Sequence, residues 1–170
     1  DSLGKELQFD PTYDLTMITH REISQTKSRT NVDYWLLGIL PENYLLLNEK
    51  DAIRLGFKDG DLARVISPSN LEGEWDLKAL GKKPMVGKVR VSQMIAPGVV
   101  AFSLGFGNWA NGAYDVVVDG TRIKGDARRG KGIHANAAML VDPHLKNTCL
   151  SDLTGGSAVF YDTNVKLVKV

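Results

Sequence analysis

The sequence is poor in cysteine, in long apolar runs and in excess charge of either sign. Its one cysteine, Cys149, excludes an intrachain disulfide and a Cys-x-x-Cys metal or redox pair. No apolar run reaches the length of a membrane span, and no signal-peptide core opens the chain. The formal net charge of +1 argues against a general binder of polyanions, although a local basic patch is compatible with it.

What is present is the composition of an ordinary globular protein. The 170 residues are 43% apolar and 24% charged, which suits a single domain over residues 1–170 with a sizeable core. Because the sequence starts at Asp1 without a methionine, we expect a processed protein or a piece excised from a longer one.

Short apolar runs broken by turn residues recur along the chain, whereas helical periodicity is scarce. This rhythm predicts a mainly β protein, a β-barrel with small helices in its connections. Residues 68–84 read as a long surface loop, and residues 86–91 alternate in the manner of an exposed edge strand. The expected strands are 15–18, 44–47, one opening at 62, 86–91, 99–104, 116–118, 122–124, 158–161 and 165–170. The dipeptide Asp119-Gly120 between two of them predicts a hairpin.

Residues 48–67 are the clearest local signal. Asn48 is expected to cap a short helix, with Asp51 as a capping-box-like partner. Gly56 occupies the position of a left-handed C-cap, and residues 58–61 read as a tight turn. The helix is expected to present an apolar face made of Ala52, Ile53 and Leu55.

A first polar stretch, residues 19–30, lies between the strand 15–18 and residues 34–37, which we expect to be at least partly buried. Its side chains could line a groove for a large polar ligand, because arginine suits phosphate and a glutamate suits a guanine-like donor edge. A solvated loop is the alternative, and composition alone favours it. The polar residues are Thr19, Arg21, Glu22, Ser24, Gln25, Thr26, Ser28, Arg29 and Thr30.

A second polar stretch, residues 103–113, is rich in glycine. Gly105, Gly107 and Gly112 permit a close approach of the backbone to another group. Trp109 offers a flat apolar face, and its neighbour Asn108 offers an amide. A turn with one core tryptophan explains the same residues equally well.

A third polar stretch, residues 125–139, is basic and also rich in glycine. It matches the first part of a phosphate-loop motif, but Gly132 stands where the Mg²⁺-binding serine or threonine belongs. A weak dinucleotide fingerprint at 130–135 lacks its strand and its downstream acid. We therefore read a basic loop, whose Arg128, Arg129 and Lys131 could meet phosphate or an acidic partner.

No catalytic or metal-binding set emerges from the residues. His20, His134 and His144 lack the spacing of metal ligands and are expected to form hydrogen bonds instead. Cys149 has no activating neighbour and is expected to be a packed thiol. The isolated chain should therefore bind no metal and show no redox activity.

Five segments in order resemble the C-terminal, molybdopterin-dinucleotide-binding domain of the dimethyl-sulfoxide-reductase family. They are Thr19-His20-Arg21-Glu22, the helix and turn from Asn48 to Asp61, the strand and aromatic turn from Pro97 to Trp109, the segment from Asn136 to Asp142, and Gly155-Gly156-Ser157. The second segment is common to double-psi β-barrels, so it indicates fold more than ligand. The resemblance runs from about residue 15 to the C-terminus.

The resemblance implies a six-stranded double-psi β-barrel that binds molybdopterin guanine dinucleotide, with molybdenum or tungsten, in a parent enzyme. Many relatives have histidine where this chain has Gln25, and the insertion from 115 to 133 departs from the family pattern. The implied cofactor-binding residues are Thr19, Arg21, Glu22, Gln25, Ser28, Asn108, Trp109 and Asn136, and we expect Arg21, Glu22, Trp109 and Asn136 to share one groove.

Within the family, Ser28-Arg29-Thr30, the loop from Asn70 to Trp75 and the segment from Asn147 to Tyr161 look most like catalytic subunits of tetrathionate reductases. Arsenate, thiosulfate and polysulfide reductases are the near alternatives. The resemblance implies a C-terminal fragment of an oxidoreductase that reduces a sulfur or arsenic oxyanion. Its expected partners are the remaining domains of the parent and an iron–sulfur electron-transfer subunit, the cluster of the parent lying in another domain.

The resemblance further implies a parent exported by a twin-arginine signal, with no nucleic-acid partner and no direct membrane insertion. Two other uses of the same fold compete with it. One is a protein-interaction module like the N-terminal domains of some AAA ATPases, against which the polar stretch and the Asn136 segment argue. The other is a self-processing decarboxylase, for which Gly156-Ser157 supplies only a dipeptide near the wrong end.

Overall fold

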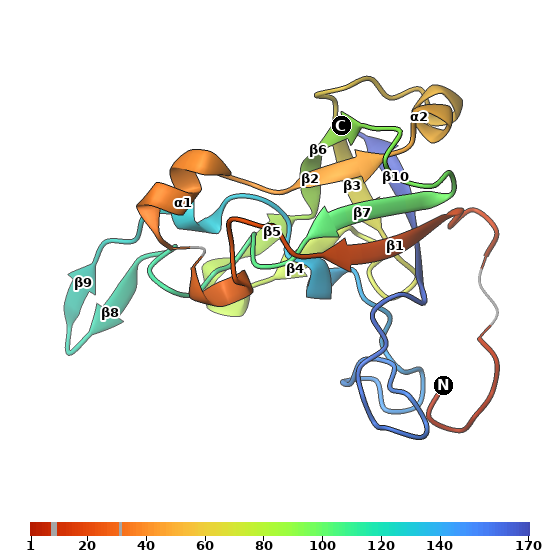
Figure 1. The fold of residues 1–170 in the computed structure, drawn as a ribbon. Helices are drawn as coiled ribbons and strands as arrows, with labels where there is room; N and C mark the ends of the chain where they lie inside the picture. The colour runs from red at the N-terminus through yellow and green to blue at the C-terminus, as the bar shows by residue number, and fades with distance from the viewer. Residues whose placement is uncertain (8–9, 31) are drawn as a thin grey trace.

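Six strands close into a barrel at the centre of the structure, a computed structural model that describes residues 1–7, 10–30 and 32–170 (Figure 1). Strands β1 and β7 pair in parallel, as do β2 and β6, and the remaining neighbours are antiparallel. This arrangement confirms the predicted six-stranded barrel. In barrel order the strands are β1 (Leu15–His20), β10 (Thr163–Lys169), β3 (Leu62–Ile66), β6 (Val86–Val91), β2 (Tyr44–Leu47) and β7 (Val99–Ser103).

The barrel interior is the hydrophobic core. Side chains alternate between the inside and the outside of each strand, so that Leu15 and Met17 of β1 are fully buried. On β6, Val89 points inward, whereas Lys88 and Arg90 are exposed. The prediction of an edge strand at 86–91 was therefore wrong, because a closed barrel has no edge strand. A barrel strand alternates apolar side chains toward the interior with polar ones toward solvent, which is the same sequence pattern that an exposed edge strand shows.

Short elements decorate the connections. The predicted surface loop at 68–84 instead contains a hairpin of β4 (Glu74–Asp76) and β5 (Lys82–Pro84). The predicted strand at 158–161 is reduced to one isolated bridge between Ser151 and Ala158. The hairpin predicted around Asp119-Gly120 is confirmed as β8 (Val116–Val118) and β9 (Thr121–Ile123). Four 3₁₀ turns complete the described part, η1 (Lys27–Arg29), η2 (Lys78–Leu80), η3 (Ala127–Gly130) and η4 (Ala135–Ala137).

Helix α2 (Glu49–Leu55) forms where the capping residues predicted it. The Asn48 carboxamide accepts the Lys50 N–H at 2.9 Å, and Gly56 ends the helix at φ 75°. Asp51 is not the capping partner that we predicted, because its buried carboxylate accepts the Gly98 N–H at 2.6 Å and so ties α2 to the start of β7. Ile53 is 75% exposed, which leaves a smaller apolar face than expected.

Helix α1 (Tyr34–Ile39) confirms only in part the expectation that residues 34–37 are at least partly buried, since Leu36 and Leu37 are covered and Tyr34 and Trp35 are exposed. Asp33 caps the helix by accepting the Trp35 N–H at 2.9 Å. Only Leu37 reaches the interior, whereas Trp35 is 89% exposed and Tyr34 is 46% exposed. The helix has six residues and projects beyond the barrel, so most of its side chains have no neighbouring layer to pack against (Figure 1).

The strand directions gather most loops at one end of the barrel. Strands β1, β3 and β7 end there and β2, β6 and β10 begin there, whereas α2 lies at the opposite end (Figure 1). We call the first end the loop end. Among the described helices, none combines the length and the apolar character needed to cross a membrane.

Asn43, just before β2, joins three segments at the loop end. Its Nδ2 donates to the carbonyls of Ser103 at 2.8 Å and Ile133 at 3.0 Å, and its Oδ1 accepts the Ile133 N–H at 2.8 Å. The residue is 1% exposed, so water is a poor substitute for these bonds. The end of β7 and the third polar stretch are thereby fixed to the start of β2.

We expect Asn43→Ala to lower the free energy of unfolding by about 3 kcal/mol, because buried donors and acceptors of Ser103 and Ile133 lose their partner. The matched control is Asn147→Ala, at an exposed asparagine, for which a change within about 0.5 kcal/mol is expected. Urea denaturation with unchanged m-values measures both. Equal losses in the two variants would show that the bridge contributes nothing.

Candidate functional site

The three polar stretches predicted from the sequence meet at the loop end. Because β1 and β7 are parallel neighbours, the chain leaves both strands on the same side, and the Leu104 N–H donates to the His20 carbonyl at 2.9 Å. The third stretch joins them through the Gly107 N–H, which donates to the Lys131 carbonyl at 2.8 Å. Residues that are about 100 positions apart in the sequence therefore form one surface.

Two glycines of the second stretch allow this contact. A Cβ atom on Gly105 would lie 2.7 Å from the Lys27 Cα, and one on Gly107 would collide with the backbone of Ile133 and His134. Both residues have positive φ, 95° and 69°, a region that other residues rarely adopt. The close backbone approach predicted for these glycines is thus confirmed, and its partner is the protein's own chain.

The first stretch divides into inward and outward side chains. Thr19 and Gln25 are buried, and Gln25 Nε2 donates to the Leu40 carbonyl at 3.4 Å. Arg21 is exposed, whereas Glu22 is half-buried with its carboxylate 3.3 Å from His20 Nε2. The side chain of Ser28 lies outside the described part of the structure. Arg21 therefore presents an exposed guanidinium directly after β1, next to a carboxylate that is 30% exposed.

The other predicted residues occupy different positions. Asn108 is 9% exposed and its Nδ2 donates to the Gly105 carbonyl at 2.8 Å, so it shapes its own turn. Trp109 is 48% exposed and offers part of its ring to solvent. Asn136 is exposed beside a cavity of about 330 Å³ whose other walls come from residues 139–160. That these residues and Arg21 and Glu22 meet one ligand stays a prediction.

Unused hydrogen-bonding groups concentrate at the loop end. In the described part of the chain, five buried side-chain atoms lack a partner, and all but Ser67 Oγ belong to the three polar stretches: Gln25 Oε1, Ser103 Oγ, Arg129 Nε and His134 Nδ1. Each unpaired buried group costs free energy, so such groups normally have water or a ligand as partner. The donor and acceptor set therefore fits a polar ligand rich in heteroatoms.

His134 belongs to a cluster that the sequence did not reveal. Its ring lies 4.3 Å from that of Trp75, centroid to centroid, and Lys83 donates to the Gly130 carbonyl beside it. Burial and the charge of Lys83 lower the pKa of His134 to about 4, and burial lowers the pKa of Lys83 to about 8. Hairpin β4–β5 thus holds the third stretch through a neutral imidazole and a largely dehydrated amine.

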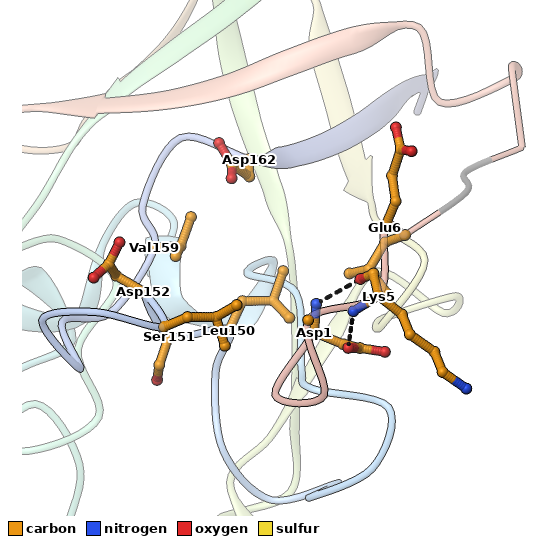
Figure 2. A pocket seen from close by; sticks show the side chains of 11 residues that line it. Asp1, Lys5, Glu6, Leu150, Ser151, Asp152, Val159 and Asp162 are labelled. Atoms are coloured by element: carbon orange, nitrogen blue, oxygen red, sulfur yellow. Dashed lines mark hydrogen bonds between the residues drawn. The ribbon is translucent and has the colours of Figure 1, made fainter.

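A cavity of about 600 Å³ lies away from the polar stretches, between the N-terminal segment and residues 150–162 (Figure 2). Its walls carry the carboxylates of Asp1, Glu6, Asp152 and Asp162 against the amines of Lys5 and of the Asp1 backbone. This excess of negative charge disfavours a phosphate-bearing ligand. In the described ranges, no three His, Cys, Asp or Glu side chains are placed to hold a metal ion.

Comparison with known proteins agrees with this geometry. The model of the family described as molydopterin dinucleotide binding domain matches residues 15–150. A selenate reductase subunit of Mesobacillus selenatarsenatis is 44% identical over 155 residues, which are 91% of this chain and 15% of that protein. A tetrathionate reductase subunit of Salmonella typhimurium is 28% identical over 145 residues, which are 84% of this chain and 13% of that protein.

The corresponding tetrathionate reductase subunit of Archaeoglobus fulgidus is 32% identical over 52% of this chain and 7% of that protein. The chain therefore spans about a seventh or less of these relatives. Among solved structures, acetylene hydratase from Pelobacter acetylenicus superposes with a TM-score of 0.59 at 19% identity, over 93% of this chain and 18% of that one. A likeness at this identity supports the fold alone.

We expect Gly107→Ala to destabilise the chain more than Gly60→Ala. Both glycines have positive φ, 69° and 85°, but nothing lies within 4 Å of a Cβ placed on Gly60. Backbone strain alone should cost about 1 kcal/mol in either variant, and the collision with His134 should add roughly 1–3 kcal/mol at Gly107. Thermal and urea unfolding measure the difference. Equal costs would mean that the two loops do not need to touch.

Stability should also depend on pH through His134. Its folded-state pKa of about 4 is below the ordinary 6.5, so the unfolded chain binds more protons between these values and stability falls as the pH drops from 6.5 to 4. The loss should reach roughly 2–3 kcal/mol. In His134→Gln this part of the profile should flatten, while His144→Gln, at a histidine partly exposed beside Asp1, serves as control. An unchanged slope in His134→Gln would refute the assignment.

Proposed function

Because the chain belongs to the family of molydopterin (molybdopterin) dinucleotide binding domains, we propose that its loop end forms one wall of the dinucleotide site in an oxidoreductase catalytic subunit. The observation that carries this proposal is the convergence of the three polar stretches, with most of the unpaired buried polar atoms of the described chain among them. A barrel that served only as a scaffold would have no need for such unsatisfied groups at one end.

The residues of this chain would bind and orient the dinucleotide. Arg21, exposed directly after β1, suits a pyrophosphate oxygen, and the half-buried Glu22 suits the donor edge of guanine. Trp109 offers a flat surface for a ring, and Asn136 offers an amide on the side of the 330 Å³ cavity. Gln25, held by the Leu40 carbonyl, would act by fixing the loop. When bound, the molybdenum or tungsten cofactor supplies the redox chemistry.

For the parent enzyme we propose the reduction of an oxyanion. The sequence pointed to tetrathionate-like substrates or to arsenic oxyanions, and the relatives include tetrathionate reductases and a selenate reductase. Selenate was not among the substrates that the sequence suggested, yet the selenate reductase shares 44% identity over 91% of this chain. We therefore propose an oxyanion of sulfur or selenium as the substrate class.

The remaining expectations are part of the same proposal. They are an iron–sulfur cluster elsewhere in the parent subunit, an iron–sulfur partner subunit, and export by a twin-arginine signal. The chain spans 15% of the selenate reductase subunit, which leaves ample sequence for those parts. A barrel used only as a protein-interaction module is the alternative, and a parent that contains no pterin would favour it.

Arg21→Ala tests the proposed wall. We expect the free energy of unfolding of the isolated chain to change by less than about 0.5 kcal/mol, because Arg21 is exposed. In the parent, the retained dinucleotide should fall about tenfold or more at limiting cofactor, because a charge-assisted hydrogen bond is lost. Lys50→Ala, an exposed cation on α2 at the opposite end, should leave both quantities unchanged.

Two measurements on the purified parent protein decide whether Arg21→Ala weakens cofactor retention. They are the molybdenum content and the amount of guanine nucleotide released. If the isolated chain instead unfolds on losing Arg21 while the parent keeps its cofactor, the residue is structural and the proposed wall is wrong.

A further inference from the structure

A patch of exposed apolar side chains lies on α1 and on the hairpin β8–β9. Both elements project from the barrel on the same side in Figure 1, and the hairpin extends beyond the helix. Trp35 is 89% exposed, Val117 is 70% exposed and Ile39 is 69% exposed. We call these side chains together the α1–hairpin surface; its members are Tyr34, Trp35, Ile39, Val116, Val117, Val118 and Ile123. Because side chains alternate along a strand, Val117 lies on the opposite face of the hairpin from Val116 and Val118, so both faces of the hairpin expose apolar groups. Exposed apolar groups gathered on adjoining segments usually mark a docking site.

The hairpin β8–β9 gains little from its own fold. Each strand has three residues, and all six are exposed. A two-residue turn at Asp119-Gly120, with φ of 50° and 77°, favours the hairpin locally. An isolated two-stranded hairpin is nevertheless only marginally stable in water. Side chains of Val116, Val117 and Val118 would therefore gain free energy from a covering surface.

The segment that directly follows the hairpin is fixed to α1. The Tyr34 hydroxyl donates to the Asp126 carboxylate at 2.8 Å, and the Asp115 carboxylate accepts the Gly125 N–H at 2.8 Å. The guanidinium carbons of Arg128 and Arg129 lie 4.6 Å and 5.0 Å from the centre of the Tyr34 ring. These contacts hold residues 126–129 against the helix, and the bond between Asp115 and Gly125 closes the base of the hairpin.

One cation at the edge of this surface has no acidic partner. Arg122 pairs with Asp115, and Arg128 pairs with Asp126. In the described part of the chain, no ion pair includes Arg129, whose Nη1 donates to the Asn111 carbonyl at 3.1 Å while its Nε is buried without a partner. A partly buried guanidinium left in this state favours a carboxylate from another surface.

We propose that the α1–hairpin surface docks onto the remaining polypeptide of the parent catalytic subunit, on an apolar face bordered by a carboxylate that pairs with Arg129. The proposal rests on the proposed function, because it requires a longer parent. The chain spans 15% of the selenate reductase subunit that it matches over 91% of its own length, so most of such a subunit lies outside it. The insertion of 115–133 would thus serve docking.

The test uses the full-length parent in its native assembly. The photo-crosslinking residue p-benzoylphenylalanine is placed at Val117 and, as a matched control, at Ile53, which is 75% exposed at the opposite end of the barrel. Mass spectrometry then locates the crosslinked peptides. We expect Val117 to crosslink within the same polypeptide, to a segment outside residues 1–170, with at least about tenfold the yield at Ile53.

Hydrogen exchange gives a second readout. Amides of 116–123 should exchange at least about tenfold more slowly in the parent than in the isolated chain. Arg129→Gln should remove most of that protection. The control Arg122→Gln, at an arginine already paired with Asp115, should leave the protection in place. A crosslink from Val117 to a different polypeptide, or to a second copy, overturns the assigned occupant.

Equal yields at Val117 and Ile53, or equal exchange rates in parent and isolated chain, overturn the docking surface itself. Dinucleotide content is measured on the same preparations. A parent without pterin but with the expected crosslinks would refute the proposed function and leave the docking surface standing.

Discussion

The side chain of Asn43 is the constraint on which the loop end depends. Its three hydrogen bonds connect the start of β2 to the end of β7 and to Ile133, and all of its atoms are shielded from water. Parallel pairing of β1 with β7 brings two polar stretches to one side of the barrel, but it does not position the third. Asn43 does so together with the backbone bond from Gly107 to Lys131, because its carboxamide both donates to the Ile133 carbonyl and accepts the Ile133 N–H.

Once the three stretches are joined, their chemistry is set by the polar groups that have no hydrogen-bonding partner within the domain. The described chain keeps its core apolar and its α2 end capped and paired, whereas the loop end retains unpaired polar atoms, an exposed Arg21 and a neutral His134. A folded protein tolerates such groups where a ligand is to complete them. Hairpin β4–β5 keeps the third stretch in place through Trp75 and Lys83.

Under the two proposals, the polar loop end contacts the ligand and the exposed apolar patch contacts the rest of the parent subunit. A domain that forms only a small share of a larger subunit needs one surface for its ligand and another for its neighbours. The sequence did not separate the exposed Trp35 from the buried Leu37, because an apolar residue at an interaction surface has the same sequence signature as one in the domain's own core.

The sequence by itself determined a β-barrel, the helix at Asn48 with its Gly56 cap and the hairpin at Asp119-Gly120, because each depends on local capping, turn chemistry or alternation of side chains, and the resemblance of five segments indicated the family. Only the tertiary structure decided that Asp51 anchors Gly98 rather than capping its helix, that residues 86–91 lie inside a closed sheet, and that Asn43, Trp75, Lys83 and His134 hold the loop end. These depend on groups brought together from distant parts of the chain, and no local pattern records which strand lies beside which.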